Sequence, residues 1–219
     1  MGSQPRHAPS VWRLYVIVDR AAAGERDLAD IAAAAIRGGA DAIQLRDKAA
    51  SAKRLLEEAL ALLPIARAGG VPLIINDRID VAMAAGANGV HLGQDDIPLE
   101  RARAIAGRSL LIGVSTHTLD QAMAAEHQGV DYIGVGPVFP TPTKPDYGSV
   151  GTSLVRQVAD RIRIPFVCIG GIDAGNVEQV RCSGGSCIAV VRAVCAATAP
   201  EDAARNLKRA ITENSRSKC

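Results

Sequence analysis

The chain has 219 residues, of which 48% are hydrophobic and only 3% aromatic, and its formal net charge is +2. This length fits one large domain or two small ones with an aliphatic core, and the small net charge argues against nucleic-acid binding. No apolar segment approaches the ~18 residues of a membrane span and the N-terminus lacks the apolar stretch of a signal peptide, so we expect a cytoplasmic protein without membrane contact.

Eight short runs rich in Val, Ile and Leu recur along the chain, each bounded by glycine, proline or polar residues. They are apolar without clean alternation, which is typical of strands buried on both faces of a parallel sheet. The runs lie at 14–19, 42–45, 72–76, 89–92, 110–115, 132–136, 165–171 and 187–191.

Alanine-rich stretches with helical spacing lie between these runs. Four of them begin with a residue that favours a helix start: Asp27, Ser51, Thr118 and Pro200. They predict helices over 27–37, 51–63, 118–128 and 200–211.

A weak internal repeat supports this alternation. The segments GGADAIQL, AGANGVHL, QGVDYIGV and SGGSCIAV each place glycine after a helix and begin a strand a few residues later. Strand–helix alternation repeated about eight times in roughly 200 residues predicts an α/β fold, a single-domain (β/α)8 TIM barrel. An open doubly wound sheet is the rival, but its GxGxxG after the first strand is missing. We expect one domain over 11–213, with flexible termini at 1–10 and 214–219.

The cysteine pattern predicts reduced thiols. Five cysteines, an odd number, form no CxxC pair and follow no secretory signal. Three of them lie in apolar or small-residue surroundings and are expected to act as small core residues.

Polar residues gather directly after the apolar runs, where a barrel binds its ligands. The cations among them are Arg46, Lys48 and Lys144, and Gln44 shares the strand parity of Arg46 and Lys48. Guanidinium and ammonium groups suit phosphate oxygens. The alternative for Lys48 is an exposed turn lysine.

The acidic residues at these ends are Asp77 and the pair Asp95–Asp96. Carboxylates beside phosphate-binding cations make electrostatic sense if a Mg²⁺ ion sits among carboxylates and substrate phosphates. The alternative for Asp77 is a helix N-cap, which is a strong competitor when this residue is taken alone.

A second anion site is expected from glycine amides, at Gly170–Gly171 after the seventh run and Gly184–Gly185 before the eighth. His91 lies inside a strand and is interpreted as a packed core imidazole, while His117 stays a minor candidate. The cations, the metal and the lack of an obvious nucleophile together indicate a reaction in which a diphosphate leaves the substrate.

The motifs QLRDK, INDRIDVAMAAGANGVHLGQDD, GVSTHT, DYIGVGPVFPTPTK and IGGI resemble thiamine-phosphate synthase over residues 15–194. The resemblance implies a (β/α)8 barrel, Mg²⁺, and a transferase that couples hydroxymethylpyrimidine diphosphate with a thiazole phosphate or its carboxylate form. The products would be thiamine phosphate and diphosphate, by a dissociative route through a pyrimidinylmethyl cation. Phosphorylated small molecules are the implied partners, and a homo-oligomer is possible.

The resemblance also assigns roles residue by residue. Asp77 and Asp96 match the Mg²⁺ carboxylates, and Gln44 and Asn76 match contacts to the pyrimidine substrate. The implied catalytic contacts to the diphosphate are Arg46, Lys48, Ser115 and Lys144. Thr141, Thr143 and Gly171 match the thiazole-phosphate site, and the further substrate-binding positions are Leu45, Asp47, Pro142, Val191 and Arg192.

One position departs from the resemblance. The family usually has serine where this chain has Arg192, so the contact of Arg192 and its amide with phosphate is open. The segment SGGSC also departs from the commoner Gly-Ala-Asp-Gly, which we expect to change packing and not chemistry. Two other functions stay open: a thiazole tautomerase, which lacks the full diphosphate and metal set, and a non-catalytic barrel that binds thiamine precursors.

Overall fold

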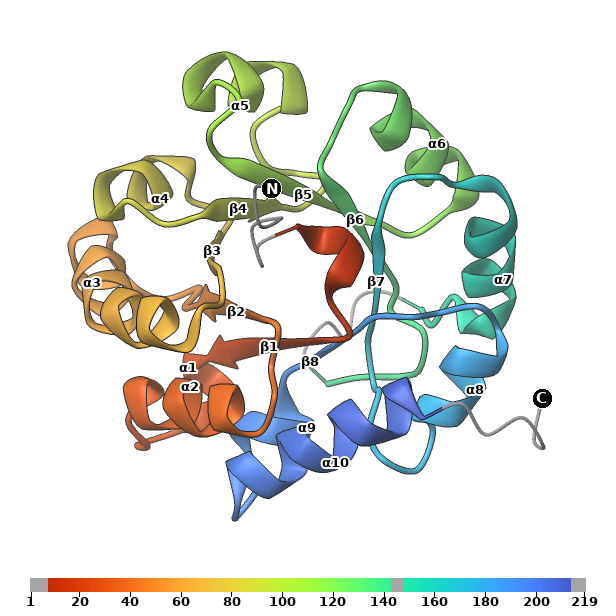
Figure 1. Cartoon of the computed structure of the whole chain (residues 1–219). Coiled ribbons are helices and arrows are strands. Elements are labelled where there is room, and N and C mark those ends of the chain that lie inside the picture. The colour runs from red at the N-terminus through yellow and green to blue at the C-terminus, as the bar shows by residue number, and fades with distance from the viewer. Residues whose placement is uncertain (1–7, 143–147, 214–219) are drawn as a thin grey trace, which may run out of the picture.

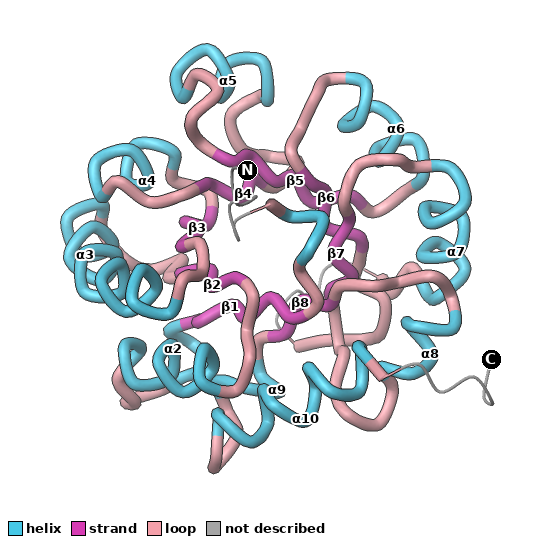
Figure 2. The backbone as a smooth tube through the Cα atoms, viewed as in Figure 1, coloured by secondary structure: helices cyan, strands magenta, loops and turns pink. Residues whose placement is uncertain are grey.

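The structure, a computed structural model, describes residues 8–142 and 148–213. Eight parallel strands close into a barrel in chain order, and helices surround it (Figures 1 and 2). The strands are β1 (Leu14–Asp19), β2 (Ala42–Arg46), β3 (Leu73–Asn76), β4 (Gly89–Leu92), β5 (Leu111–Thr116), β6 (Tyr132–Val135), β7 (Phe166–Ile169) and β8 (Ile188–Val190).

The predicted barrel is confirmed, and the open doubly wound sheet is excluded. Closure is direct, because β1 pairs with β8 in parallel through Leu14↔Ile188, Tyr15↔Ala189 and Val16↔Val190. In an open sheet the first and last strands in this order would both be edges.

Helices lie between the strands, before β1 and after β8. They are η1 (Pro9–Val11), α1 (Arg20–Ala23), α2 (Leu28–Arg37), α3 (Ala52–Gly69), α4 (Ile79–Ala85), α5 (Leu99–Ala106), α6 (Leu119–His127), α7 (Gly151–Arg161), α8 (Val177–Cys182), α9 (Arg192–Cys195) and α10 (Pro200–Thr212). The predicted helix starts are confirmed: the side chains of Asp27, Ser51 and Thr118 accept backbone N–H groups in the first turn, and Pro200 begins α10.

One helix end was predicted wrongly. The expected helix over 51–63 stopped before Pro64, yet α3 continues through it to Gly69. Proline removes one N–H and favours a break. The buried side chains Leu62, Leu63 and Ala66 on both sides of Pro64 hold the helix against the barrel, so packing outweighs the lost hydrogen bond.

The repeated glycines end helices as expected. Gly39, Gly86, Gly129 and Gly184 have φ of 100°, 66°, 76° and 93°, a region that side chains with a Cβ rarely adopt. Each turn leads into the even-numbered strand that follows.

The core has two layers separated by the strands. Alternate side chains point outward to the helices, as Ile43 and Leu45 do, and inward to the barrel, as Ala42 does. The inner layer is small, and Trp12 closes it at the end of the barrel from which the strands begin. Its indole ring packs edge-to-face on Tyr15 and Tyr132, at centroid distances of 5.5 and 5.2 Å.

The thiols agree with the expectation at three positions. Cys168, Cys187 and Cys195 are free and buried, and burial raises the pKa of each thiol above its ordinary value. The prediction of reduced thiols is wrong at Cys182, which is disulfide-bonded.

Candidate active site

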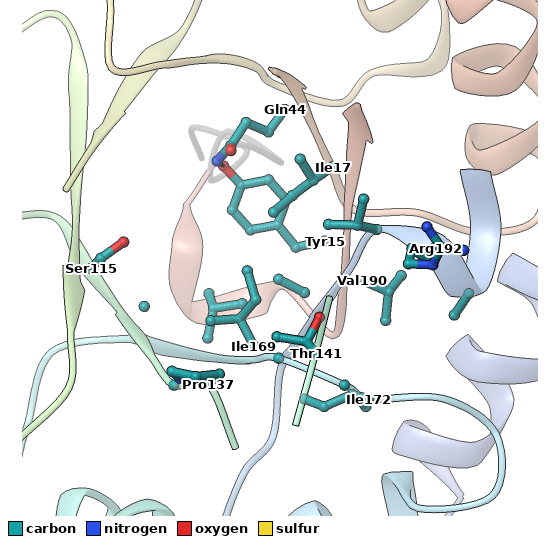
Figure 3. Close-up of a pocket in the computed structure, with 18 of the residues that line it drawn as sticks. Tyr15, Ile17, Gln44, Ser115, Pro137, Thr141, Ile169, Ile172, Val190 and Arg192 are labelled. Carbon is teal, nitrogen blue, oxygen red and sulfur yellow. Dashed lines mark hydrogen bonds between the residues drawn. The ribbon is translucent and has the colours of Figure 1, made fainter. Parts of the chain in front are cut away.

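A cavity of about 480 Å³ opens at the end of the barrel where the strands finish. Its lining comes from all eight strands and the loops after them, and Figure 3 shows part of it. Nine of the residues predicted for the site line this cavity: Gln44, Arg46, Asn76, Ser115, Thr141, Pro142, Gly171, Val191 and Arg192.

Some of the other predicted residues do not line the cavity. Leu45 is fully buried between the barrel and the helices, because it has the opposite parity to Gln44, so only its backbone faces the strand end. Asp47 accepts the backbone N–H groups of Ala49 and Ala50 and shapes the turn after β2. Thr143 and Lys144 lie outside the described residues.

Arg46 is fixed by a buried carboxylate. Its guanidinium donates to Asp19, which is the register partner of Arg46 on β1 and is 2% exposed. The second oxygen of Asp19 accepts the Ala22 N–H at 2.9 Å and caps α1. Because both carboxylate oxygens are engaged, Arg46 is held at one orientation at the rim of the cavity.

A second charged group lies beside the cavity on the loops after β2, β3 and β4. The Lys48 ammonium pairs with Asp77, and Asp96 accepts the Gly93 N–H at 2.6 Å. Burial raises the pKa of Asp96 above its ordinary value, and the neighbouring Asp77 carboxylate raises it further. Lys48 is exposed, as a turn lysine would be, but its ammonium group forms an ion pair with Asp77.

Asp77 does not cap a helix, so that alternative is wrong. The N-cap of α4 is Arg78, and no side-chain cap hydrogen bond forms there. Asp77 has φ of 60° at the centre of a tight turn in which Arg78 N donates to Asn76 O at 2.7 Å. Its own N–H donates to His91 O at 2.8 Å, which locks this left-handed turn to β4 and turns the carboxylate toward Lys48 and Asp96.

The pair Asp77 and Asp96 fits a divalent cation. Two adjacent carboxylates repel each other, and a cation between them relieves the repulsion that raises the pKa of Asp96. Within residues 8–142 and 148–213, no cluster of three or more His, Cys, Asp or Glu side chains could hold a metal by itself. The donor set therefore suits an ion that completes its coordination with substrate oxygens and water.

The far side of the cavity is built from glycines and backbone. Gly170 and Gly171 have φ of 105° and 62°, and a Cβ on Gly171 would lie 2.6 Å from Pro140 O. Val138 N and Phe139 N donate to Ile169 O and Gly170 O, at 2.8 and 3.0 Å. Glycine is therefore required for the loop after β6 to lie directly on the loop after β7.

The expected contribution of Gly184 and Gly185 to this site is wrong. They precede β8 and so lie at the opposite end of the barrel, whereas ligands are bound where strands end. A Cβ on Gly184 would be 2.6 Å from that of Ala159, and one on Gly185 would be 2.6 Å from a Val180 methyl. These glycines allow α7 and α8 to pack closely.

Arg192 begins α9 directly after β8 and lines the cavity. Its side chain is exposed at the mouth, and none of the described residues pairs with its guanidinium. Figure 3 shows Arg192 and Ser115 on opposite sides of the cavity. The cationic group is therefore available to a ligand.

Three side chains of the cavity were missed or misread from the sequence. Tyr15 and Tyr132 were not predicted, and His91 is not a core imidazole, since its half-buried ring lines the cavity. The minor candidate His117 also lines the cavity, with Nδ1 2.5 Å from Gly136 O. Strand parity could have found Tyr15, which shares its inward parity with the cavity residue Ile17.

In the part of the chain that the structure describes, no helix is long and apolar enough to cross a membrane. The cytoplasmic location expected from the sequence stays a prediction.

Comparisons with known proteins agree with this geometry. The family model described as thiamine monophosphate synthase matches residues 14–194. A thiamine-phosphate synthase of Roseiflexus castenholzii is 49% identical over 195 residues, covering 89% of this chain and 86% of that protein. The enzyme of the same name from Chloroflexus aurantiacus is 46% identical, covering 92% of this chain and 93% of that protein.

Solved structures show the same likeness. Thiamine phosphate pyrophosphorylase from Pyrococcus furiosus superposes with a TM-score of 0.86 at 36% identity, covering 95% of this chain and 98% of that one. A geranylgeranylglyceryl phosphate synthase from Thermoplasma acidophilum has a TM-score of 0.71 at 17% identity, which shows a shared fold alone.

Proposed function

The chain belongs to the thiamine monophosphate synthase family, and we propose that it acts as a single catalytic domain over residues 11–213. It is a transferase that couples hydroxymethylpyrimidine diphosphate with a thiazole phosphate and releases thiamine phosphate and diphosphate. The observation that supports the site best is the division of one cavity into a charged wall and a glycine wall.

The charged wall suits the diphosphate. Arg46 offers a planar fork whose orientation Asp19 fixes, and Ser115 offers a hydroxyl near the end of β5. Lys48 lies beside the cavity with Asp77 and Asp96. Asn76 lines the cavity between these groups at the end of β3. Bound Mg²⁺, held by Asp77 and Asp96, would supply neutralisation of charge on the leaving diphosphate.

These residues favour a leaving-group mechanism over attack by a protein nucleophile. As the bond between carbon and diphosphate oxygen breaks, negative charge grows on the diphosphate. Preorganised cations lower the barrier if they are better placed for this charge than for the ground state. The resemblance gives Lys144 the same role.

The glycine wall suits the phosphate of the thiazole. Gly171 and Thr141 both line this wall, and Arg192 adds a cation that none of the described residues pairs with. A phosphate there would lie after β7 and β8, where barrels commonly bind one. The separation of the two walls keeps two anions apart while the reacting carbon and nitrogen meet in the apolar middle.

The test is release of diphosphate and formation of thiamine phosphate when both precursors and Mg²⁺ are supplied to the purified chain. Omitting either precursor must abolish the product. Isomerisation of the thiazole alone would support the tautomerase, and binding of both precursors without turnover would support the non-catalytic barrel.

A further inference from the structure

A continuous line of hydrogen bonds crosses the barrel beneath the cavity. Gln44 Nε2 donates to the Tyr15 hydroxyl at 2.8 Å, and this hydroxyl lies 3.0 Å from that of Tyr132. The Tyr132 hydroxyl lies 3.2 Å from His91 Nδ1, and His91 Nε2 lies 3.0 Å from Ser115 Oγ. Figure 3 shows Gln44 reaching toward the Tyr15 hydroxyl. Both ends of the line, Gln44 and Ser115, face the cavity.

With the Gln44 amide nitrogen toward Tyr15, the line has only one direction in which both phenol protons find an acceptor. Tyr15 oxygen accepts from Gln44, so the Tyr15 proton must go to Tyr132 oxygen. The Tyr132 proton then goes to His91 Nδ1, and His91 carries its proton on Nε2 and donates to Ser115. In the reverse direction the Tyr15 proton has no acceptor in this line, which is costly for a buried hydroxyl.

Burial keeps both phenols protonated. Tyr15 and Tyr132 are 2% and 0% exposed, and burial raises the pKa of each above its ordinary value. A neutral phenol has one proton to give, so the order of donors and acceptors is fixed along the line.

The backbone makes room for this line. A Cβ on Gly113 would lie 2.2 Å from the Tyr132 ring and 2.6 Å from His91 Nδ1. A Cβ on Gly134 would lie 3.3 Å from the His91 ring. Neither glycine has a positive φ, so space and not backbone conformation requires them.

We propose that Tyr15, Tyr132 and His91 are positioning residues that fix the hydrogen-bonding polarity of Gln44 and Ser115. The Gln44 amide nitrogen is held by Tyr15, so its oxygen faces the cavity as an acceptor. Ser115 accepts from His91, so its own proton faces the cavity as a donor. The cavity therefore selects a ligand with an amino group near β2 and an anionic oxygen near β5.

This selection deepens the proposed function, on which it rests. An aminopyrimidine offers N–H to the Gln44 oxygen, whereas the deaminated oxopyrimidine offers a carbonyl and clashes with it electrostatically. A hydroxyl facing the cavity suits a diphosphate oxygen. The hydrogen-bond line therefore connects the Gln44 contact with the amino group to the Ser115 contact with the diphosphate.

The first experiment is independent of turnover. Nitrogen-15 NMR of the histidine-labelled full chain reports the protonated ring nitrogen of each of the four histidines, and His91→Gln assigns the His91 signals. We expect neutral His91 with the proton on Nε2 at neutral pH. A proton on Nδ1, or on both nitrogens, overturns the proposal.

The second experiment measures binding of the aminopyrimidine diphosphate and its oxo analogue by calorimetry. Tyr132→Phe removes the acceptor of Tyr15, so Tyr15 can donate to the Gln44 oxygen and the amide can turn over. We expect the preference for amino over oxo to fall by about 10-fold. An unchanged preference in a folded variant overturns the proposal.

Cys187→Ala is the matched control, because Cys187 is 3% exposed in the same inner layer but neither lines the cavity nor joins the line. It should leave the preference for amino over oxo unchanged. An equal loss of preference in Cys187→Ala and Tyr132→Phe would show that weaker packing of the inner layer causes the loss, and would overturn the proposal. Absence of thiamine phosphate formation with the His91 signature intact would contradict the proposed function and leave the hydrogen-bond line standing.

Discussion

The two walls of the cavity offer anions different chemistry. From β1 to β4 the strand ends carry ionised side chains in pairs, Arg46 with Asp19 and Lys48 with Asp77. From β6 to β8 they carry glycines, prolines and exposed backbone, and Arg192 is the one cation among the described residues that line the cavity there. One barrel therefore uses side-chain charge on one side and backbone shape on the other.

The difference follows from what each wall must do. A leaving diphosphate gains charge during the reaction, and fixed ionic groups respond to that change. A phosphate that stays bound through the reaction keeps its charge, so a close-fitting backbone is sufficient to hold it. Substitutions on the charged wall should therefore affect turnover, and those on the glycine wall should affect stability and binding.

The largest effect is expected on the charged wall, from Asp96→Asn. The variant keeps an acceptor for Gly93 N but loses one of two carboxylates that suit Mg²⁺. We expect kcat to fall by about 10³-fold, since several kcal/mol of charge stabilisation are lost. Steady-state kinetics over a range of Mg²⁺ concentrations checks this. Full activity in the presence of a chelator would show that the reaction does not need a metal ion.

Asp95→Asn is the control for that experiment. Asp95 is adjacent in sequence and exposed, and it does not line the cavity. Its turnover should match that of the unmodified chain.

Arg46→Lys is expected to have the next largest effect. Lysine keeps the charge but loses the planar fork that spans Asp19 and the cavity. We expect kcat/KM for the pyrimidine diphosphate to fall by about 10²-fold, while KM for the thiazole phosphate stays unchanged. Equal changes in the KM values of both substrates would show that Arg46 does not act on the pyrimidine diphosphate alone.

On the glycine wall, Gly171→Ala should reduce stability. The new Cβ combines a φ of 62° with a clash 2.6 Å from Pro140 O. We expect the free energy of unfolding to fall by about 2–3 kcal/mol in a denaturant titration.

Gly86→Ala separates backbone conformation from the clash. Gly86 has a φ of 66° and its Cβ would meet only Arg67, at 3.9 Å. It should cost about 1 kcal/mol. If both variants lose the same stability, the close approach of the two loops is not what requires Gly171.

The smallest effect is expected from Arg192→Ser at the exposed mouth. We expect KM for the thiazole phosphate to rise by about 5-fold, since an exposed ionic contact contributes roughly 1 kcal/mol. Pyrimidine binding and the melting temperature should not change. A rise in KM for the pyrimidine diphosphate instead would place Arg192 on the other wall.

The sequence by itself determined the fold and the types of chemistry. Apolar runs, helix caps and the repeated glycines depend on local geometry, so strand order and barrel closure followed from them. Local rules failed where packing was stronger, at Pro64 within α3, and where a strand begins, at Gly184 and Gly185.

Only the tertiary structure decided which polar groups meet. The turn at Asp77, the pairing of Arg46 with Asp19 and the line from Gln44 to Ser115 each join residues of different strands. Sequence spacing predicts on which face of its strand a side chain lies. It predicts neither the register between strands nor which partner donates in a hydrogen bond between them. Those depend on barrel closure, which brings β1, β2, β4, β5 and β6 around one small interior.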